Sequence, residues 1–498
     1  MMASQGRSPT GDHRRWGRRL HGRPHEPEAT ADVARPRRKA HWKRKSAALL
    51  AALTVASPML AACGTDEGGP TVLRFMGPAD GVDQYTAAAQ KCSDQADGRY
   101  TIEYDVSAKQ TDDQRLQLAR RIVGGDDSFD IMGLDVTWTA EFAEAGWAVE
   151  FPEDVAKRVE DGTLSGPMET ATWDDKVYGA PLNTNTQLMW YRKSLMPQGP
   201  DGQPAPPRTW EEIAAHGGTL ADEGKPSYIG VQAAQYEGVV VWFNSMLEAA
   251  GGSIVDESGR EATIDEGDAA QRALEAMKAV ATAKGADPST SQLDENMARL
   301  AFDRGDAFMQ VNYPFVYAGL KEKAEGGDAR AKEAFDDLGW AVYPGIQADE
   351  PSKATIGGLN IAVPSTSKNQ DLAFEAIECL RNEENQLHNA LTGGLPPTLT
   401  KLYTEATDEF IEEYPFYREI FESLNTLDPA DLGPEEQSLL PDERTVSVAV
   451  RPASPAYQSV SILLASRLSP PGEIDPESLV PELADEIDRA IKSEGLVP

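Results

Sequence analysis

The chain has 498 residues and a formal net charge of −34, with 81 acidic side chains against 47 Lys and Arg. Residues 1–62 hold 13 of the Lys and Arg but only 4 of the acidic residues, so removing them leaves a charge of −43. Such an acidic surface disfavours nucleic acid and anionic lipid as partners, because both are polyanions. The 436 residues that remain are too many for one ordinary core and predict two or more lobes.

The N-terminal segment has the order of a secretory signal, with many basic residues before an apolar run over 46–60. This run is shorter than the roughly 20 residues that span a bilayer as a helix. It leads into the lipobox Leu-Ala-Ala-Cys, in which the thiol of Cys63 can take a diacylglyceryl group before cleavage. We therefore expect a signal peptide over 1–62 and a linker over 63–70 behind a lipid anchor at the extracellular face of the cell membrane. The alternative is an uncleaved anchor helix beside a coincidental cysteine.

Strands and helices alternate after the linker. Residues 71–75 and 100–106 predict strands, and the Ala-rich stretch 84–91 between them predicts a helix. A helix is also predicted over 114–123, where two glycines end it, and a short buried strand over 129–132. This alternation predicts an α/β lobe with a largely parallel sheet.

The rest of the chain continues this alternation. Helices are predicted at 210–215, 239–250, 269–284, 296–304, 372–382 and 481–493, and strands at 228–231, 307–311, 339–343 and 360–364. The last helix opens with Pro481, because a proline at a helix start loses no hydrogen bond. A polar, acidic and Pro-rich stretch at 428–444 predicts a surface loop.

Two cysteines remain besides Cys63. Cys92 and Cys379 would lie in an oxidising compartment, where a disulfide between them can persist, and two separate buried thiols are the alternative. The six histidines have no metal-binding spacing, four of them preceding residue 43, and no Gly-rich phosphate loop occurs. We therefore expect neither a metal nor a cofactor.

Several segments, in this order, resemble the carbohydrate-binding family of ABC-importer substrate-binding proteins, extracellular solute-binding protein family 1. Each segment alone is weak, but the ordered set is specific and covers nearly all of the mature chain. Within the family, the chain resembles the trehalose and maltose binders at Tyr236-Glu237, at Asn312-Tyr313-Pro314, and at Arg451-Pro452-Ala453-Ser454 followed by Tyr457. It is most similar to the actinobacterial lipoproteins that recover trehalose, although Tyr313 stands where a tryptophan is common. The segments that carry the family resemblance are 129–131, 135–143, 177–186, 188–193, 207–212, 302–309, 312–314 and 357–360.

The resemblance implies a two-lobed α/β fold of the type II periplasmic-binding-protein class, with hinge strands between the lobes and the ligand in the cleft. On this basis 71–180 forms the first part of the N-terminal lobe and 181–355 mainly the second lobe. Residues 356–498 supply the hinge return, the remainder of both lobes and a C-terminal helix. The implied protein is a monomer that hands a sugar to the permease subunits of an ABC importer.

A neutral disaccharide needs carboxylate and amide acceptors, a guanidinium donor and a flat apolar face for each ring. Positions that match the family supply these groups. Gly358 and Leu359 could present backbone groups near the cleft, and the guanidinium of Arg451 could donate hydrogen bonds in two directions. Asp135 is the most suggestive, because α/β sheets bind ligands at the carboxyl ends of their strands. The expected site consists of Asp80, Gln114 and Asp135 from one lobe, Asn185, Glu295 and Tyr313 largely from the other, and Gly358, Leu359 and Arg451.

Each of these side chains also has an ordinary structural interpretation. Asp80 could cap a helix, Asn185 could form a turn and Glu295 could be a solvated acid in a first helical turn. Gln114 could be a surface polar residue, and Tyr313 could pack in the core. Arg451 could make only a surface ion pair.

Two other classes of protein compete with a sugar binder. Asp135 and Glu295 could be the carboxylate pair of a secreted glycoside hydrolase, although a chain this acidic contains some such pair by chance. A structural or adhesion lipoprotein would not need alternating α/β lobes. We favour a binder without enzymatic activity, with trehalose as its ligand and maltose or another oligosaccharide as the alternative.

Overall fold

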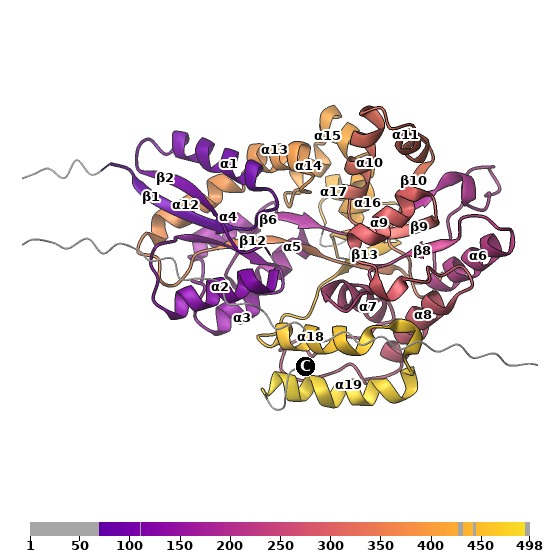
Figure 1. Ribbon diagram of the computed structural model, residues 1–498. Helices are drawn as coiled ribbons and strands as arrows, with labels where there is room; N and C mark the ends of the chain where they lie inside the picture. Colours follow the sequence, from indigo (N-terminus) through magenta and orange to yellow (C-terminus); the bar gives the residue numbers. More distant parts are fainter. Residues whose placement is uncertain (1–68, 110, 427–431, 442–444, 494–498) are drawn as a thin grey trace, which may run out of the picture. The chain divides into compact units, whose positions relative to one another are not determined.

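Two separate β-sheets organise the computed structural model, which describes residues 69–109, 111–426, 432–441 and 445–493 (Figure 1). These described residues all belong to one compact unit of the chain. The signal segment and Cys63 lie outside the described residues.

The first sheet has the strand order β2-β1-β3-β12-β6. In it β1 (Thr71–Gly77) runs parallel to β2 (Tyr100–Val106) and β3 (Ile131–Asp135). The later strand β12 (Gly357–Ala362) is antiparallel to both β3 and β6 (Ala180–Asn185). The carboxyl ends of β1, β3 and β6 and the amino end of β12 therefore meet at one edge.

Helices cover both faces of the first sheet (Figure 1). Strand side chains alternate between the faces, so that Phe75 packs on one side and Met76 on the other. The two apolar layers that result close the core of this lobe. One face carries α1 (Val82–Gln95), α4 (Glu153–Glu160) and α12 (Gln370–Leu380), and the other carries α2 (Thr111–Val123) and α3 (Thr139–Glu144).

A disulfide joins Cys92 of α1 to Cys379 of α12, as predicted, with their Cα atoms 5.9 Å apart. The two residues are 287 positions apart in the chain. The bond thus fastens the first helix of the lobe to the helix that follows β12.

The second sheet has the order β10-β7-β9-β8. Its centre is formed by β7 (Leu188–Arg192) and β9 (Ala307–Asn312), which are antiparallel. At the edges, β10 (Leu338–Ala341) is antiparallel to β7, and β8 (Tyr228–Gly230) is parallel to β9.

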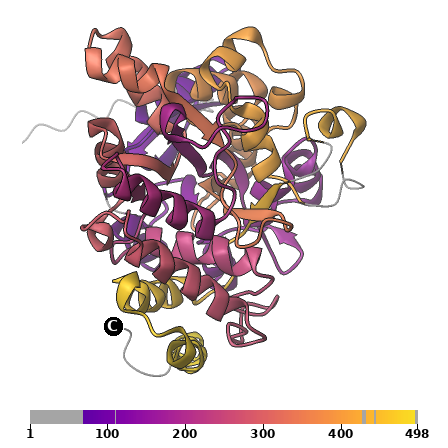
Figure 2. The same ribbon diagram turned by 90° about the vertical axis from the view of Figure 1, so that its right-hand side faces the viewer.

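Two helical layers enclose the second sheet. The C-terminal helices, yellow in Figures 1 and 2, pack on α7 and α8 and so extend one of these layers. That layer contains α6 (Trp210–Asp222), α7 (Glu237–Ala249), α8 (Ala269–Thr282), α18 (Tyr457–Leu468) and α19 (Pro476–Ile491). The other contains α9 (Glu295–Arg304), α10 (Phe315–Glu325), α11 (Ala329–Asp336) and α16 (Tyr417–Ser423). Further helices are α5 (Ser165–Thr170), α13 (Glu383–Gly393), α14 (Lys401–Thr404), α15 (Asp408–Glu413) and α17 (Pro434–Gln437).

Short connections carry the chain between the two sheets. Thr186 and Gln187 link β6 of the first sheet to β7 of the second. The return passes through β11 (Ser352–Thr355), which pairs with β13 (Val446–Ala449), and then through Ile356 into β12. The structure thus confirms the predicted α/β class with two lobes joined by strands.

Two predicted helix boundaries are wrong by five residues or more, and other helix ends differ from the prediction by up to four residues. The last helix begins at Pro476 rather than Pro481, because Pro476 takes the favourable start position and Pro481 lies exposed inside the helix. Helix α6 runs past the predicted end at 215 to Asp222. Gly217 lies inside this helix and is buried, and a Cβ there would lie 3.2 Å from the Phe308 ring.

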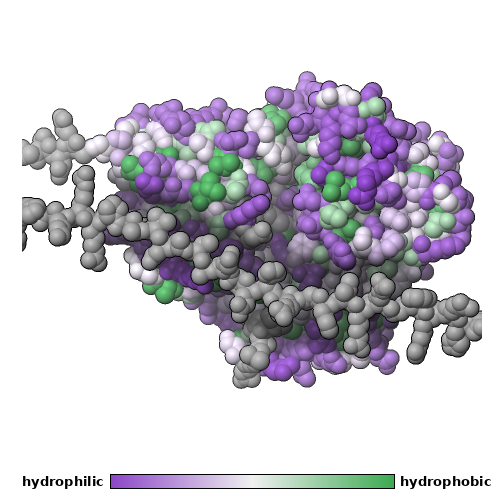
Figure 3. All heavy atoms as spheres, in the orientation of Figure 1, coloured by the Kyte–Doolittle hydropathy of each residue, from purple (hydrophilic) through white to green (hydrophobic). Residues whose placement is uncertain are grey.

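The part of the acidic stretch that the structure describes, 432–441, contains the short helix α17. In the described ranges no helix is both long and apolar enough to cross a bilayer. On the face drawn in Figure 3 hydrophilic residues predominate and apolar residues occur in small groups, in keeping with the acidic composition.

Candidate functional site

Four of the predicted site residues meet at one edge of the first sheet. Leu359 pairs with Asp135 of β3, and Gly357 pairs with Asn185 of β6. Gly358 between them has φ +143°, and a Cβ there would lie 2.5 Å from the Asn183 carbonyl oxygen, so only glycine fits. The edge therefore presents a carboxylate, an amide and the backbone of the Gly357–Leu359 stretch side by side.

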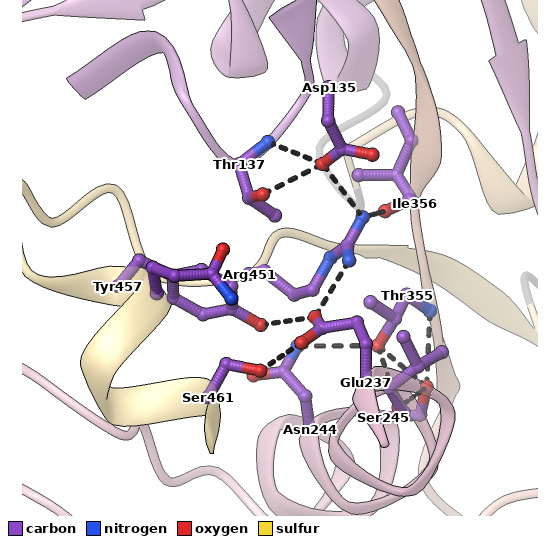
Figure 4. A network of polar contacts seen from close by, with 12 residues as sticks. Asp135, Thr137, Glu237, Asn244, Ser245, Thr355, Ile356, Arg451, Tyr457 and Ser461 are labelled. Atoms are coloured by element: carbon purple, nitrogen blue, oxygen red, sulfur yellow. Dashed lines mark hydrogen bonds and ion pairs between the residues drawn. The ribbon is translucent and has the colours of Figure 1, made fainter. Parts of the chain in front are cut away.

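Arg451 reaches this edge from the segment that follows β13 (Figure 4). Its Nη1 donates to Oε1 of Glu237 at 2.8 Å, and its Nη2 donates to the Ile356 carbonyl at 3.2 Å. The same Nη2 lies 4.0 Å from Oδ1 of Asp135. Because Glu237 begins α7 in the second lobe and Asp135 ends β3 in the first, the guanidinium connects the two lobes.

Asp135 is held in place by its own turn. Thr137 donates to Oδ1 of Asp135 from both its backbone N–H, at 3.0 Å, and its hydroxyl, at 2.7 Å. Within the described residues no hydrogen bond engages the other oxygen, Oδ2. One oxygen of the carboxylate thus orients the group, and the other remains available to a ligand.

The guanidinium of Arg451 keeps its positive charge although its side chain is only 7% exposed. Burial alone would lower its pKa, but the negative charges of Asp135 and Glu237 and the nearby Tyr457 outweigh this effect and raise the pKa. The site therefore holds a permanent cation between two carboxylates.

Glu295 and Tyr313 form the part of the site that the second sheet supplies. Asn312 at the end of β9 connects them, since its Nδ2 donates to the Glu295 carbonyl at 2.9 Å and its Oδ1 accepts from the Tyr313 N–H at 3.0 Å. Burial raises the pKa of Tyr313, and the charges of Glu295 and Asp135 raise it further. Burial also raises the pKa of Glu295, against the effect of the neighbouring Tyr236. Tyr313 thus lies within electrostatic reach of Arg451 and Asp135, and Glu295 lies within reach of Tyr313.

Asp80 and Gln114 lie farther from this cluster. Asp80 is exposed in the turn after β1, at the same sheet edge, where its charge adds to the burial that raises the pKa of Tyr85. Gln114 is half-buried in the first turn of α2. Within the described ranges neither side chain makes a hydrogen bond or an ion pair with Arg451. The structure thus brings together seven of the nine predicted residues, Asp135, Asn185, Glu295, Tyr313, Gly358, Leu359 and Arg451.

A cavity adjoins the cluster without containing it. It has a volume of about 430 Å³ and is lined from the first lobe by Thr137 and Thr170 and from the second by Asn244, Glu248 and Arg451. Of the nine predicted residues only Arg451 lines it. We place the candidate site at the sheet edge, because the complementary polar groups converge there, and the cavity lies beside it.

Sequence reasoning missed some of the groups that shape the site. Thr137 and Ser461 were not predicted as site residues, whereas Glu237 and Tyr457 belonged only to the resemblance. Tyr457 and Ser461 are four residues apart, the spacing that puts two side chains on one helix face, and this signal was available. In the part of the chain that the structure describes, no three His, Cys, Asp or Glu side chains are grouped as metal ligands.

Comparison with known sequences connects these features to transport proteins. The sequence profile of a family described as bacterial extracellular solute-binding protein matches residues 82–387. A probable ABC transporter-binding protein of Deinococcus radiodurans is 28% identical over 334 residues, which are 64% of this chain and 73% of that protein. The diacetylchitobiose-binding protein DasA of Streptomyces coelicolor is 24% identical over 379 residues, 71% of this chain and 82% of its own.

Solved structures share the fold. Maltose-bound MalE3 of T. maritima superposes with a TM-score of 0.65 at 22% identity, covering 84% of this chain and 99% of its own. The GacH receptor of Streptomyces glaucescens, solved unliganded and with acarbose, gives 0.62 at 21% identity and covers 86% of this chain and 100% of its own. These similarities confirm the type II two-lobed fold.

Proposed function

Because the chain belongs to the bacterial extracellular solute-binding protein family, whose profile matches more than half of it, we propose that it captures a disaccharide for an ABC importer. The similar proteins described above bind diacetylchitobiose, maltose and acarbose, which supports a glycoside as the ligand. The residues most similar to trehalose-recovering lipoproteins make trehalose the first candidate and maltose the second.

The observation that carries this proposal is the pair formed by Asp135 and Arg451. They come from opposite lobes, and the 4.0 Å between Nη2 and Oδ1 is longer than a hydrogen bond. A sugar hydroxyl both donates and accepts, so one hydroxyl can donate to the carboxylate of Asp135 while accepting from Arg451. The ligand then touches both lobes, which is the condition for coupling its binding to their relative position.

We propose that the remaining members of the cluster complete the ligand site. Asn185 and Glu295 offer oxygen acceptors and Tyr313 an aromatic face, whereas Gly358 and Leu359 offer backbone groups. Asp80 and Gln114 are proposed as outer contacts. We propose a binder without catalysis, so that an assay for disaccharide hydrolysis should detect no product.

We further propose that the mature protein is a lipid-anchored monomer on the extracellular face of the cell membrane. The support is the basic and apolar leader ending at the lipobox cysteine, Cys63. The permease subunits of the importer are its protein partner in this proposal.

The function is tested by calorimetry with trehalose and maltose on the parent, Asp135→Ala and Arg451→Ala. Each substitution removes a hydrogen bond to a charged group and leaves its partner unpaired, so affinity should fall about ten- to a hundredfold. Glu435→Ala, at an exposed position in α17, should bind like the parent. Unchanged affinity in both cleft variants would show that the site is elsewhere, and a parent that binds neither sugar would refute the proposed ligands.

A further inference from the structure

The carboxylate of Glu237 accepts three hydrogen bonds from the protein itself. Nη1 of Arg451 and the hydroxyl of Tyr457 both donate to Oε1, at 2.8 and 2.7 Å. The hydroxyl of Ser461 donates to Oε2 (Figure 4). An ionised carboxylate has about four acceptor positions, so most of its capacity is used inside the protein.

Glu237 and its three donors come from three different segments. Glu237 lies in the first turn of α7, where a negative charge is favoured by the helix dipole. Tyr457 and Ser461 are one turn apart on α18, and Arg451 lies in the loop before that helix. Glu237 therefore joins α7, α18 and the arginine in one cluster.

The cluster fixes where the guanidinium points. With Nη1 held by Glu237 and Nη2 bonded to the Ile356 carbonyl, rotation about the end of the side chain would break both hydrogen bonds. In this orientation Nη2 faces Asp135. A donor that is already oriented loses less freedom when a ligand binds, and this raises affinity without any new contact.

We propose that Glu237, together with Tyr457 and Ser461, is a positioning group that holds Arg451 toward Asp135 and thereby sets ligand affinity without touching the ligand. This inference rests on the proposed function for its ligand, but the orientation of Arg451 can be measured without one.

A double-mutant cycle separates positioning from direct contact. Affinity for trehalose and maltose is measured by calorimetry in the parent, Tyr457→Phe, Arg451→Lys and the double variant. Loss of the Tyr457 hydroxyl should weaken binding about tenfold in the parent and less than about twofold in the Arg451→Lys background, because the arginine it positions is gone. Penalties that multiply in the double variant would overturn the inference.

Tyr403→Phe is the matched control. It removes a buried phenol hydroxyl that donates to the Pro397 carbonyl at 2.9 Å, in a core cluster that contains none of the proposed ligand contacts. It should leave affinity unchanged. A loss equal to that of Tyr457→Phe would mean that both act through general stability and would also overturn the inference.

The ligand-free readout is the NMR signal of the Arg451 Nη protons. In the parent, restrained rotation should keep the Nη protons distinct, and Tyr457→Phe, Ser461→Ala and Glu237→Gln should each average them. Signals that are unchanged in all three variants would refute positioning, whether or not the parent binds either sugar. Failure to bind both sugars, with averaged signals in the variants, would instead refute only the proposed ligand.

Discussion

Glu248 is a buried carboxyl in α7, about three helical turns beyond Glu237, and lines the cavity beside the candidate site. Asn244 donates to its Oε1 at 3.1 Å and also donates to the hydroxyl of Thr355, which directly precedes Ile356. The carboxyl is thus connected through neighbouring groups to the carbonyl that binds Arg451. Its ionisation is therefore of interest for both stability and binding.

Burial raises the pKa of Glu248 to about 8, against the opposing effects of Lys353 and the Asn244 hydrogen bond, and the charge of Glu169 adds to the rise. In the unfolded chain the group ionises near its ordinary value of 4.5. Between these values the folded chain keeps a proton that the unfolded chain has lost, so the free energy of unfolding falls as pH rises. The contribution is complete below the unfolded pKa and is lost as pH rises to the folded one.

We expect Glu248→Gln to remove this pH dependence. Its melting temperature should exceed that of the parent at a pH of about 8.5, and the difference should shrink as the pH falls to about 4, where the parent carboxyl is mostly protonated in both states. Thermal unfolding at several pH values measures this difference in melting temperature, with a substitution at an exposed position, Glu435→Gln, as the control. Parent and variant curves that stay parallel over this range would contradict the raised pKa.

At the residue scale, the sequence located a candidate residue where the end of a predicted strand determines its position. Asp135 was recognisable because it follows a buried strand, and β3 does end at this residue. The role of Glu237 was not recognisable, because its partners Tyr457 and Ser461 lie 220 and 224 positions away. Only folding brings α18 against α7, and no local sequence pattern indicates that these two helices are in contact.

At the scale of elements, periodicity predicted most strands and helices with small errors at their ends. The strand 100–106 is reproduced residue for residue, and the helix predicted at 296–304 begins one residue earlier. The helix predicted at 210–215 continues to Asp222 through Gly217, a buried glycine that packs beside Phe308 and does not end the helix. Propensity alone does not distinguish a glycine inside a helix from one that ends it.

The disulfide is the covalent link between two elements, and we expect its removal to be costly. Replacing both Cys92 and Cys379 by alanine should lower the free energy of unfolding by about 2–5 kcal/mol, because the bond closes a loop of 287 residues in the unfolded chain. Urea unfolding measures this difference. The parent treated with a reductant should match the double variant, and two free thiols in denatured, non-reduced parent would contradict the bond.

At the scale of the whole molecule, chain length predicted two or more lobes, whereas the strands that connect the lobes were predicted only from the family resemblance. The sheet order β2-β1-β3-β12-β6 includes a strand that returns after the whole second sheet has formed. Composition does not indicate such a return. The resemblance implied a cleft between the lobes, but most residues that line this cavity were not predicted, since they come from five separate segments.

The last prediction concerns how the whole protein is held at the cell surface. The thiol of Cys63 is the proposed acceptor of the diacylglyceryl group, so Cys63→Ala should abolish lipid attachment and leave the chain unprocessed or released. Membrane fractionation and the mass of the N-terminal peptide measure the outcome. The double alanine variant of Cys92 and Cys379 is the control, because it loses two thiols but keeps Cys63 and should remain lipidated in the membrane fraction. A Cys63→Ala protein that is still cleaved and membrane-bound would refute the lipid anchor, since acyl chains on that thiol would then not be what holds it.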